Sequence, residues 1–188
     1  MKANAVILHG TDSSPQQFWF PWLKGLLEQR GFDVWCPQLP DANAPDLKTQ
    51  LPFVLNGWNY NSQSILIGHS AGVPLALALA EAIALRSSGP SLAQLVLVAG
   101  YLDLGREVDP IVKPSASYAW KTMQATTSGK NYVINSNNDP WGCDHTQGAL
   151  IAKLLNATQV ICYGQGHFGS ETFQQPYREF ELLENLIG

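Results

Sequence analysis

Six short runs of apolar residues recur along the 188-residue chain, each only a few residues long. They are apolar at consecutive rather than alternate positions, which is typical of strands covered on both faces. The longer segments between them include several with helical spacing of apolar residues. Because parallel strands need crossover connections, usually helices, this alternation predicts an α/β fold with a mostly parallel sheet and helices on both faces. The expected strands are 5–8, 34–36, 64–67, 94–99, 132–135 and 159–162.

One segment, residues 101–130, does not fit the alternation, because it carries charges and prolines and only a short helical stretch near 118–126. We expect this segment to form a reduced lid over the functional site. The chain length is usual for one domain, so residues 1–188 are expected to form a single domain. The other expected helices are 19–30, 46–58, 71–86, 144–156 and 175–187.

Composition excludes several classes of function. The net charge of −4, without a basic block, disfavours nucleic acid and anionic membranes as partners. No apolar run approaches the about 18 residues of a membrane span, and the apolar stretch near the first residue is too short for a signal peptide. Cys36, Cys143 and Cys162 form no CxxC pair, so neither a disulfide framework nor a zinc ribbon is indicated. Reduced thiols favour a cytoplasmic protein.

The segment GHSAG joins the third expected strand to a long helix rich in alanine and leucine. A nucleophile elbow consists of a strand, a Gly-x-Ser-x-Gly turn and a helix in this order. The elbow exposes the hydroxyl of Ser70, and Gly68 and Gly72 let the helix pass close to the strand. The backbone N–H of Ala71 is then a candidate donor to an oxyanion. The alternative is an ordinary glycine-rich turn without catalytic function.

A serine nucleophile needs a base, and His167 is the candidate. It follows the last expected strand, within the glycine-rich segment GQGHFG, as a catalytic loop would. The other three histidines are expected to have no catalytic role. His9 follows the first strand and is expected to be structural, and His69 is expected to be buried. His145 is expected to be solvated in the first turn of a helix. The alternative for His167 is an ordinary loop histidine.

In elbow hydrolases the acid lies between the serine and the histidine in the chain. Asp139 comes just after the fifth expected strand, and Pro140 holds it extended and out of the next helix. Asp144 suits the N-cap of that helix instead. The alternative for Asp139 is a turn-forming residue in an Asp-Pro loop.

The loop after the first strand is expected to supply the second oxyanion donor. Its first candidate is the N–H of Thr11, and its second is that of Asp12. A carboxylate beside a developing oxyanion is unfavourable, so the side chain of Asp12 is expected to point outward or to cap a helix. The aromatic residues at 18–22 are expected to wall the pocket in part and to pack into the core in part.

These motifs resemble those of the small serine hydrolases related to retinoblastoma-binding protein nine and the bacterial YdeN-like proteins, compact members of the α/β-hydrolase superfamily. The resemblance covers almost the whole chain and includes ILHGTDSSPQQFWFPWLK, VWCPQLPDANAPDL, LIGHSAG, NNDPW and GQGHFG. It implies a three-layer α/β-hydrolase fold with Ser70 as nucleophile, Asp139 as acid and His167 as base. The sequence departs from many relatives at Asp12 and Ser13, where they continue with glycines.

The expected function is hydrolysis of a carboxylic ester or related acyl bond of a small molecule through an acyl-enzyme. Water completes such a cycle, so no metal or cofactor is expected. Thioesters and amides stay open as substrates. The alternative from another class is a binding or protein-interaction module on a hydrolase fold, with weak or no catalysis.

Overall fold

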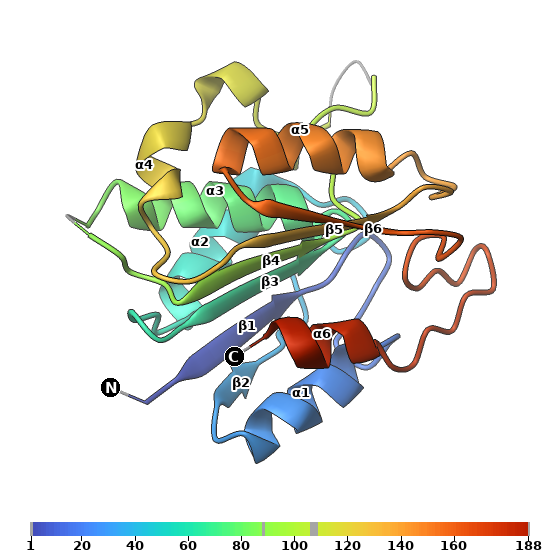
Figure 1. Ribbon diagram of the computed structural model, residues 1–188, viewed down its shortest axis with the longest axis horizontal. Helices are drawn as coiled ribbons and strands as arrows, with labels where there is room; N and C mark the ends of the chain where they lie inside the picture. Colours follow the sequence, from blue (N-terminus) through green and yellow to red (C-terminus); the bar gives the residue numbers. More distant parts are fainter. Residues whose placement is uncertain (1, 88, 106–108, 188) are drawn as a thin grey trace.

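The computed structural model describes residues 2–87, 89–105 and 109–187, and within these ranges six parallel strands form one sheet (Figure 1). The order across the sheet is β2-β1-β3-β4-β5-β6, so the chain starts one strand in from an edge, forms that edge with β2, and then proceeds from β3 to β6 on the other side of β1. All six expected strands are confirmed, with ends that differ by one or two residues. Their bounds are β1 Asn4–Leu8, β2 Asp33–Trp35, β3 Ile65–His69, β4 Gln94–Val98, β5 Tyr132–Ser136 and β6 Thr158–Cys162.

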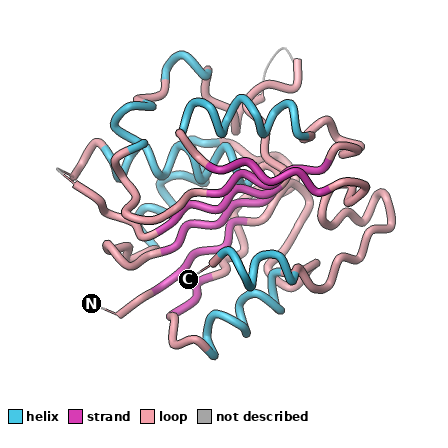
Figure 2. Tube along the Cα trace, viewed as in Figure 1, coloured by secondary structure: helices cyan, strands magenta, loops and turns pink. Residues whose placement is uncertain are grey.

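Helices cover both faces of the sheet, as the strand pattern predicts (Figures 1 and 2). On one face lie α1 (Phe20–Gln29) and α6 (Glu181–Leu186). On the other face lie α2 (Leu47–Gly57), α3 (Gly72–Ala84), α4 (Trp120–Gln124) and α5 (His145–Leu155). A short 3-10 turn, Ser115–Ser117, precedes α4. The result is a three-layer arrangement.

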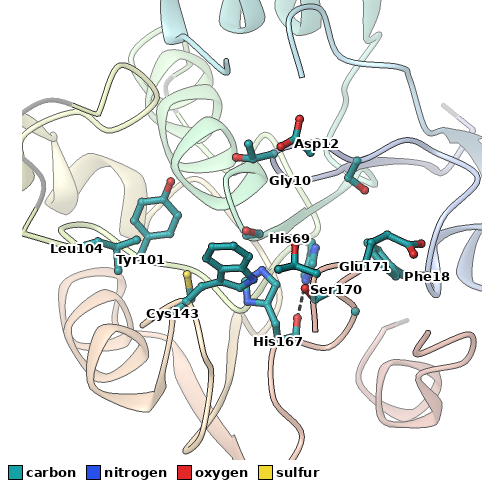
Figure 3. Close-up of a pocket in the computed structure, with 16 residues that line it drawn as sticks. Gly10, Asp12, Phe18, His69, Tyr101, Leu104, Cys143, His167, Ser170 and Glu171 are labelled. Atoms are coloured by element: carbon teal, nitrogen blue, oxygen red, sulfur yellow. Dashed lines mark hydrogen bonds between the residues drawn. The ribbon is translucent and has the colours of Figure 1, made fainter. Parts of the chain in front are cut away.

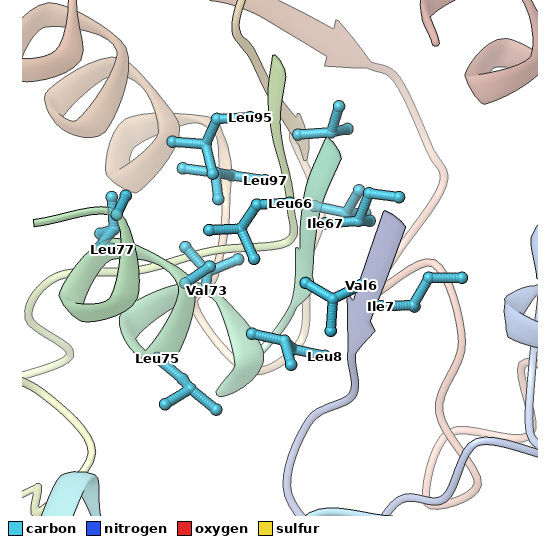
Figure 4. Close-up of a cluster of buried hydrophobic side chains, with 14 of the residues drawn as sticks. Val6, Ile7, Leu8, Leu66, Ile67, Val73, Leu75, Leu77, Leu95 and Leu97 are labelled. Atoms are coloured by element: carbon cyan, nitrogen blue, oxygen red, sulfur yellow. The ribbon is translucent and has the colours of Figure 1, made fainter. Parts of the chain in front are cut away.

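The core is centred on β3 and α3. All five residues of β3 are buried, as are twelve of the thirteen residues of α3, which explains why this helix is apolar on nearly every side. Figure 4 shows Leu66 and Leu97 of the sheet beside Val73 of α3. With 13 residues α3 is the longest described helix, and no described helix has both the length and the apolar character needed to cross a membrane.

The last helix is shorter than the sequence predicts. It begins at Glu181 instead of position 175, because the preceding residues are held in other conformations. Gln175 pairs with Ser170 in an isolated bridge with N···O distances of 2.8 and 3.0 Å. Pro176 lacks an N–H, and Tyr177 has a positive φ of 35°, so neither residue continues a helix from Gln175.

Part of the segment 101–130 packs on the helical layer, where the described residues anchor it to α3. The carboxylate of Glu81 accepts a hydrogen bond from the backbone N–H of Ala119 (2.7 Å) and forms an ion pair with Lys113. Residues 106–108 lie outside the described residues. The lid expected over 101–130 therefore stays a prediction.

Gly68 and Gly72 lie where α3 passes closest to the sheet. A Cβ on Gly72 would lie 2.2 Å from the carbonyl oxygen of Leu8, and one on Gly68 would lie 2.5 Å from the carbonyl oxygen of Gly72. Both distances are far below van der Waals contact. Glycine at these positions is therefore a requirement of the packing.

We expect Gly72→Ala to lower the free energy of unfolding by roughly 1–3 kcal/mol or more, because α3 or β1 must shift. Gly25→Ala is the matched control, since a Cβ at Gly25 of α1 meets nothing within 4 Å. That change should raise stability by about 0.5–1 kcal/mol through lower backbone entropy of the unfolded chain. Urea unfolding of both variants measures the contrast. A Gly72→Ala protein as stable as the wild type would contradict the close approach.

Candidate active site

The parallel sheet brings three loops together at the carboxyl ends of its strands. Ser70 follows β3, the loop with Asp139 follows β5, and the loop with His167 follows β6. Ser70 and His167 line a cavity of about 260 Å³, in which Figure 3 labels His167. Asp139 is in contact with His167. The structure thus brings together at one site the three residues that the sequence predicts as catalytic.

Ser70 has a conformation that L-residues rarely adopt. Its φ is 55°, in the left-handed region, and its backbone N–H donates to the carbonyl of Val98 (3.0 Å). Gly10 makes room for it, since a Cβ there would lie 2.7 Å from the Cβ of Ser70. This turn between β3 and α3 places a partly exposed hydroxyl at the cavity.

Asp139 and His167 form a buried pair. The distance between Oδ2 of Asp139 and Nδ1 of His167 is 2.7 Å, and the carboxylate is fully buried. The other oxygen of Asp139 accepts from the backbone N–H of Trp141 (2.8 Å). Since a carboxylate accepts, Nδ1 of the neutral ring carries the proton and Nε2 does not. Asp144 lies at the N-cap of α5 and accepts from the N–H of Thr146 (2.8 Å), as expected.

The loop that carries His167 is held by polar residues at the end of β5 and directly after it, which sequence reasoning missed. Three consecutive backbone N–H groups of the loop each donate to one side chain of this run. The pairs are Gly164 with Asn137 (2.8 Å), Gln165 with Ser136 (3.0 Å) and Gly166 with Asn138 (2.9 Å). The available signal was the run Ser-Asn-Asn directly before Asp139, since short polar side chains readily bind backbone groups.

Two buried side chains hold the next two carbonyls of the same loop. Nε2 of His69 lies 2.8 Å from the carbonyl oxygen of His167, and Nε1 of Trp19 donates to that of Phe168 (2.9 Å). Burial, with a smaller contribution from the nearby His167, lowers the pKa of His69 to about 3, so its ring is neutral and donates through Nε2. The expected burial of His69 is confirmed, and the residue also positions His167.

The remaining histidines lie outside this network. His9 accepts from the backbone N–H of Leu39 at Nε2 (3.0 Å), and its Nδ1 lies 2.9 Å from the carbonyl of Gly10. It is a structural residue, as expected, and burial lowers its pKa. His145 was expected to be solvated, but it is only partly exposed and its Nδ1 is buried without a partner among the described residues.

Two backbone N–H groups near Ser70 are candidates for oxyanion binding. Within the described residues, neither the N–H of Ala71 nor that of Thr11 donates to another protein group. Ala71 is the N-cap of α3, and Thr11 lines the cavity. The N–H of Asp12 is used, since it donates to the carbonyl of Ala42 (2.8 Å), and its residue is exposed as expected.

The cavity has an apolar wall and an acidic rim. Tyr101, Leu104 and Cys143 lie together on one side in Figure 3, and Asp12 and Glu171 lie elsewhere around the opening. No lysine or arginine is among the described residues that line it. The neighbouring aromatic residues divide as expected: one lines the cavity and others are in the core. Phe18 lines the cavity and is also part of the core, while Trp19 and Phe20 are in the core only.

A sequence profile of the family described as serine hydrolase matches residues 5–185. The chain belongs to the serine hydrolase family. It is 30% identical to YdeN of Bacillus subtilis over 172 residues, which are 89% of this chain and 87% of YdeN. It is also 27% identical to serine hydrolase RBBP9 of Rattus norvegicus over 165 residues, which are 85% of this chain and 83% of that protein.

The fold agrees with this family. The crystal structure of the ydeN gene product from B. subtilis superposes with a TM-score of 0.84 at 21% identity, covering 98% of this chain and 96% of that one. Further neighbours are α/β hydrolases, among them one from Enterococcus faecalis with a TM-score of 0.61, 18% identity and coverage of 98% and 89%. The expected α/β-hydrolase fold and the resemblance to these serine hydrolases are confirmed. The chain is an enzyme of the hydrolase class.

The neutral state of His69 predicts a pH dependence of stability. Its pKa is about 3 in the folded protein, against 6.5 for a histidine exposed to water, so below pH 6.5 the unfolded chain binds a proton that the folded chain does not. Above pH 6.5, His69 should therefore have no effect on the pH dependence of the free energy of unfolding. Between pH 6.5 and pH 3, that free energy should fall by up to about 1.4 kcal/mol for each pH unit.

Urea unfolding across this pH range should show a shallower fall for His69→Gln, which keeps an N–H donor but does not titrate. His9 contributes a fall of the same sign in both proteins, because its folded pKa is lowered too. Ring resonances of His69 that shift with a midpoint near neutral pH in the folded protein would contradict the neutral assignment.

Proposed function

We propose that this serine hydrolase cleaves a carboxylic ester or related acyl bond, with Ser70 as nucleophile, His167 as general base and Asp139 as the acid that orients it. The observation that carries the proposal is the buried 2.7 Å contact between Asp139 and His167, beside a serine held in the left-handed conformation at the same cavity. Each of the three follows a different strand, in the chain order usual for elbow hydrolases.

The position of the proton on the His167 ring determines which nitrogen acts as the base in the first step. Because Nδ1 of His167 donates to Asp139, Nε2 accepts the proton of the Ser70 hydroxyl as Oγ attacks the acyl carbonyl. The resulting imidazolium is stabilised by the carboxylate and returns the proton to the leaving alcohol. Water then attacks the acyl-enzyme, gives its proton to Nε2, and frees Ser70 and the carboxylic acid. No metal or cofactor enters this cycle.

The tetrahedral intermediates carry a negative charge on the former carbonyl oxygen. We assign the backbone N–H groups of Ala71 and Thr11 as its donors, since neither is used by another protein group in the described part of the chain. Ala71 lies at the N-terminus of the 13-residue helix α3, where the helix dipole also favours an anion.

The cavity favours a small substrate without negative charge. Its volume of about 260 Å³ lies just below the roughly 300–1,000 Å³ of typical ligand sites. Tyr101 and Leu104 offer an apolar wall, while the carboxylates of Asp12 and Glu171 would repel an anionic substrate. A small neutral acyl ester fits these features. Thioesters and amides use the same chemistry and are the substrates to compare with it.

Covalent labelling separates this proposal from a binding module on the same fold. A fluorophosphonate should react with the folded protein at one site and raise its intact mass by a single adduct. Ser70→Ala should abolish the adduct, and Ser117→Ala, at an exposed turn outside the cavity lining, should retain it. An unlabelled wild-type protein, or an adduct that persists in Ser70→Ala, would favour the binding module.

Two neighbouring aspartates give a matched test of the acid. Asp139→Asn leaves Nδ1 of His167 facing an amide that cannot stabilise the imidazolium or fix the tautomer, so turnover of an acyl ester should fall by roughly 10³–10⁴-fold. Asp144→Asn keeps a side-chain oxygen for the N–H of Thr146, so turnover and melting temperature should change little. The acid is misassigned if Asp144→Asn is the crippled enzyme and Asp139→Asn is not.

A further inference from the structure

One side chain of a metal-binding type lines the cavity and has no part in the proposed mechanism. The thiol of Cys143 lies in the cavity wall, in the loop between β5 and α5, and the residue is 1% exposed. One ligand atom from each of Asp139, Cys143 and His167 lies within 4.8 Å of the other two. Among the described residues, no other group of three histidine, cysteine or acidic side chains offers its ligand atoms so close together.

Carboxylate, thiolate and imidazole are the donor types that Zn²⁺ prefers, and three protein ligands leave its fourth position to a water. Bond lengths of about 2.0–2.3 Å place tetrahedral ligand atoms roughly 3.2–3.8 Å apart. The present spread of up to 4.8 Å exceeds this spacing by about 1 Å, so the ligand atoms must move together by that amount when an ion binds. The cavity gives an ion its path, since Cys143 and His167 both line it.

We propose that Asp139, Cys143 and His167 form an inhibitory site for Zn²⁺ or a similar thiophilic divalent cation. The charges balance, because the carboxylate and the thiolate together offset the two positive charges of the ion in a buried site. The thiol releases one proton to solvent on binding. Nδ1 of His167 becomes the ligand, since it already faces Asp139, and its proton moves to Nε2.

This tautomer explains the inhibition, and this step rests on the proposed function. With a metal on Nδ1 and a proton on Nε2, the ring has no lone pair to accept the proton of Ser70. The metal also occupies the carboxylate that would stabilise the imidazolium. Metal binding and acyl transfer are therefore mutually exclusive.

The test measures binding and inhibition separately on the metal-free protein. Co²⁺ replaces Zn²⁺ as a spectroscopic probe, and a thiolate-to-cobalt charge-transfer band should appear in the wild type and in Cys162→Ser. The band should be lost in Cys143→Ser and weakened in His167→Gln. Cys162 is a suitable control, because it lies in β6 and outside the cavity lining.

Inhibition is read as the Zn²⁺ concentration that halves ester turnover, relative to each variant's own metal-free rate. Loss of a residue that only supports a metal ligand lowers metal affinity by roughly 10–100-fold, so loss of the ligand Cys143 itself should cost at least as much. Cys143→Ser should therefore raise this Zn²⁺ concentration by at least roughly 10-fold, while Cys162→Ser should leave it unchanged. Equal inhibition of Cys143→Ser and the wild type, or a wild type that binds no Co²⁺ through thiolate, would overturn the proposal. A cobalt band that depends on Cys143 in a protein without esterase activity would support the metal site and count against the proposed function alone.

Discussion

The close approach of α3 to the central strands is the constraint on which the site depends. The helix passes β1 so tightly that a single methyl group at Gly72 would overlap the carbonyl of Leu8. The chain can turn from β3 into a helix at this distance only by way of Ser70 in the left-handed region. The close packing of α3 on the sheet therefore also exposes the hydroxyl of Ser70. The stability of a fully buried central layer offsets the cost of the strained residue.

The histidine loop shows how a long irregular segment is held without regular secondary structure. Side chains at the end of β5 and directly after it bind three of its N–H groups, and His69 and Trp19 bind two of its carbonyls. These contacts come from three separate parts of the chain, and the two made by His69 and Trp19 are buried. They fix the backbone on both sides of His167, so that its ring meets Asp139 with little freedom to turn. A site ordered in advance in this way loses little entropy when a substrate binds.

The environment that suits proton transfer also suits a cation. Asp139 and His167 are buried together at the wall of a cavity whose nearby carboxylates, Asp12 and Glu171, add negative potential. The thiol of Cys143 completes a ligand set that the acyl-transfer chemistry does not need. This combination makes the proposed enzyme sensitive to thiophilic metal ions through the same atoms that would perform its reaction.

The sequence by itself determined the layers, the strands and the elbow, because these follow from local patterns: consecutive apolar residues, helical spacing, and Gly-x-Ser-x-Gly between a strand and a helix. It also separated Asp139 from Asp144, since Pro140 and a helix N-cap act on their immediate neighbours. The end of the chain was predicted less well. The pairing of Gln175 with Ser170 and the backbone conformations around Pro176 replace the first turns of the expected last helix.

Only the tertiary structure decided which side chains hold the loops of the site in place. The contacts of Ser136, Asn137 and Asn138 with the histidine loop depend on β5 and β6 being neighbours in the sheet. The contact between His69 and the carbonyl of His167 depends on β3 lying in the same sheet, with β4 and β5 between it and β6. The same holds for Cys143, whose sequence neighbourhood gives no sign that its thiol lies near Asp139 and His167. Such contacts join residues far apart in the chain, and their distances are set by strand order and loop path. The spacing of residues along the sequence determines neither the strand order nor the loop path. These contacts could therefore be identified only in the folded protein.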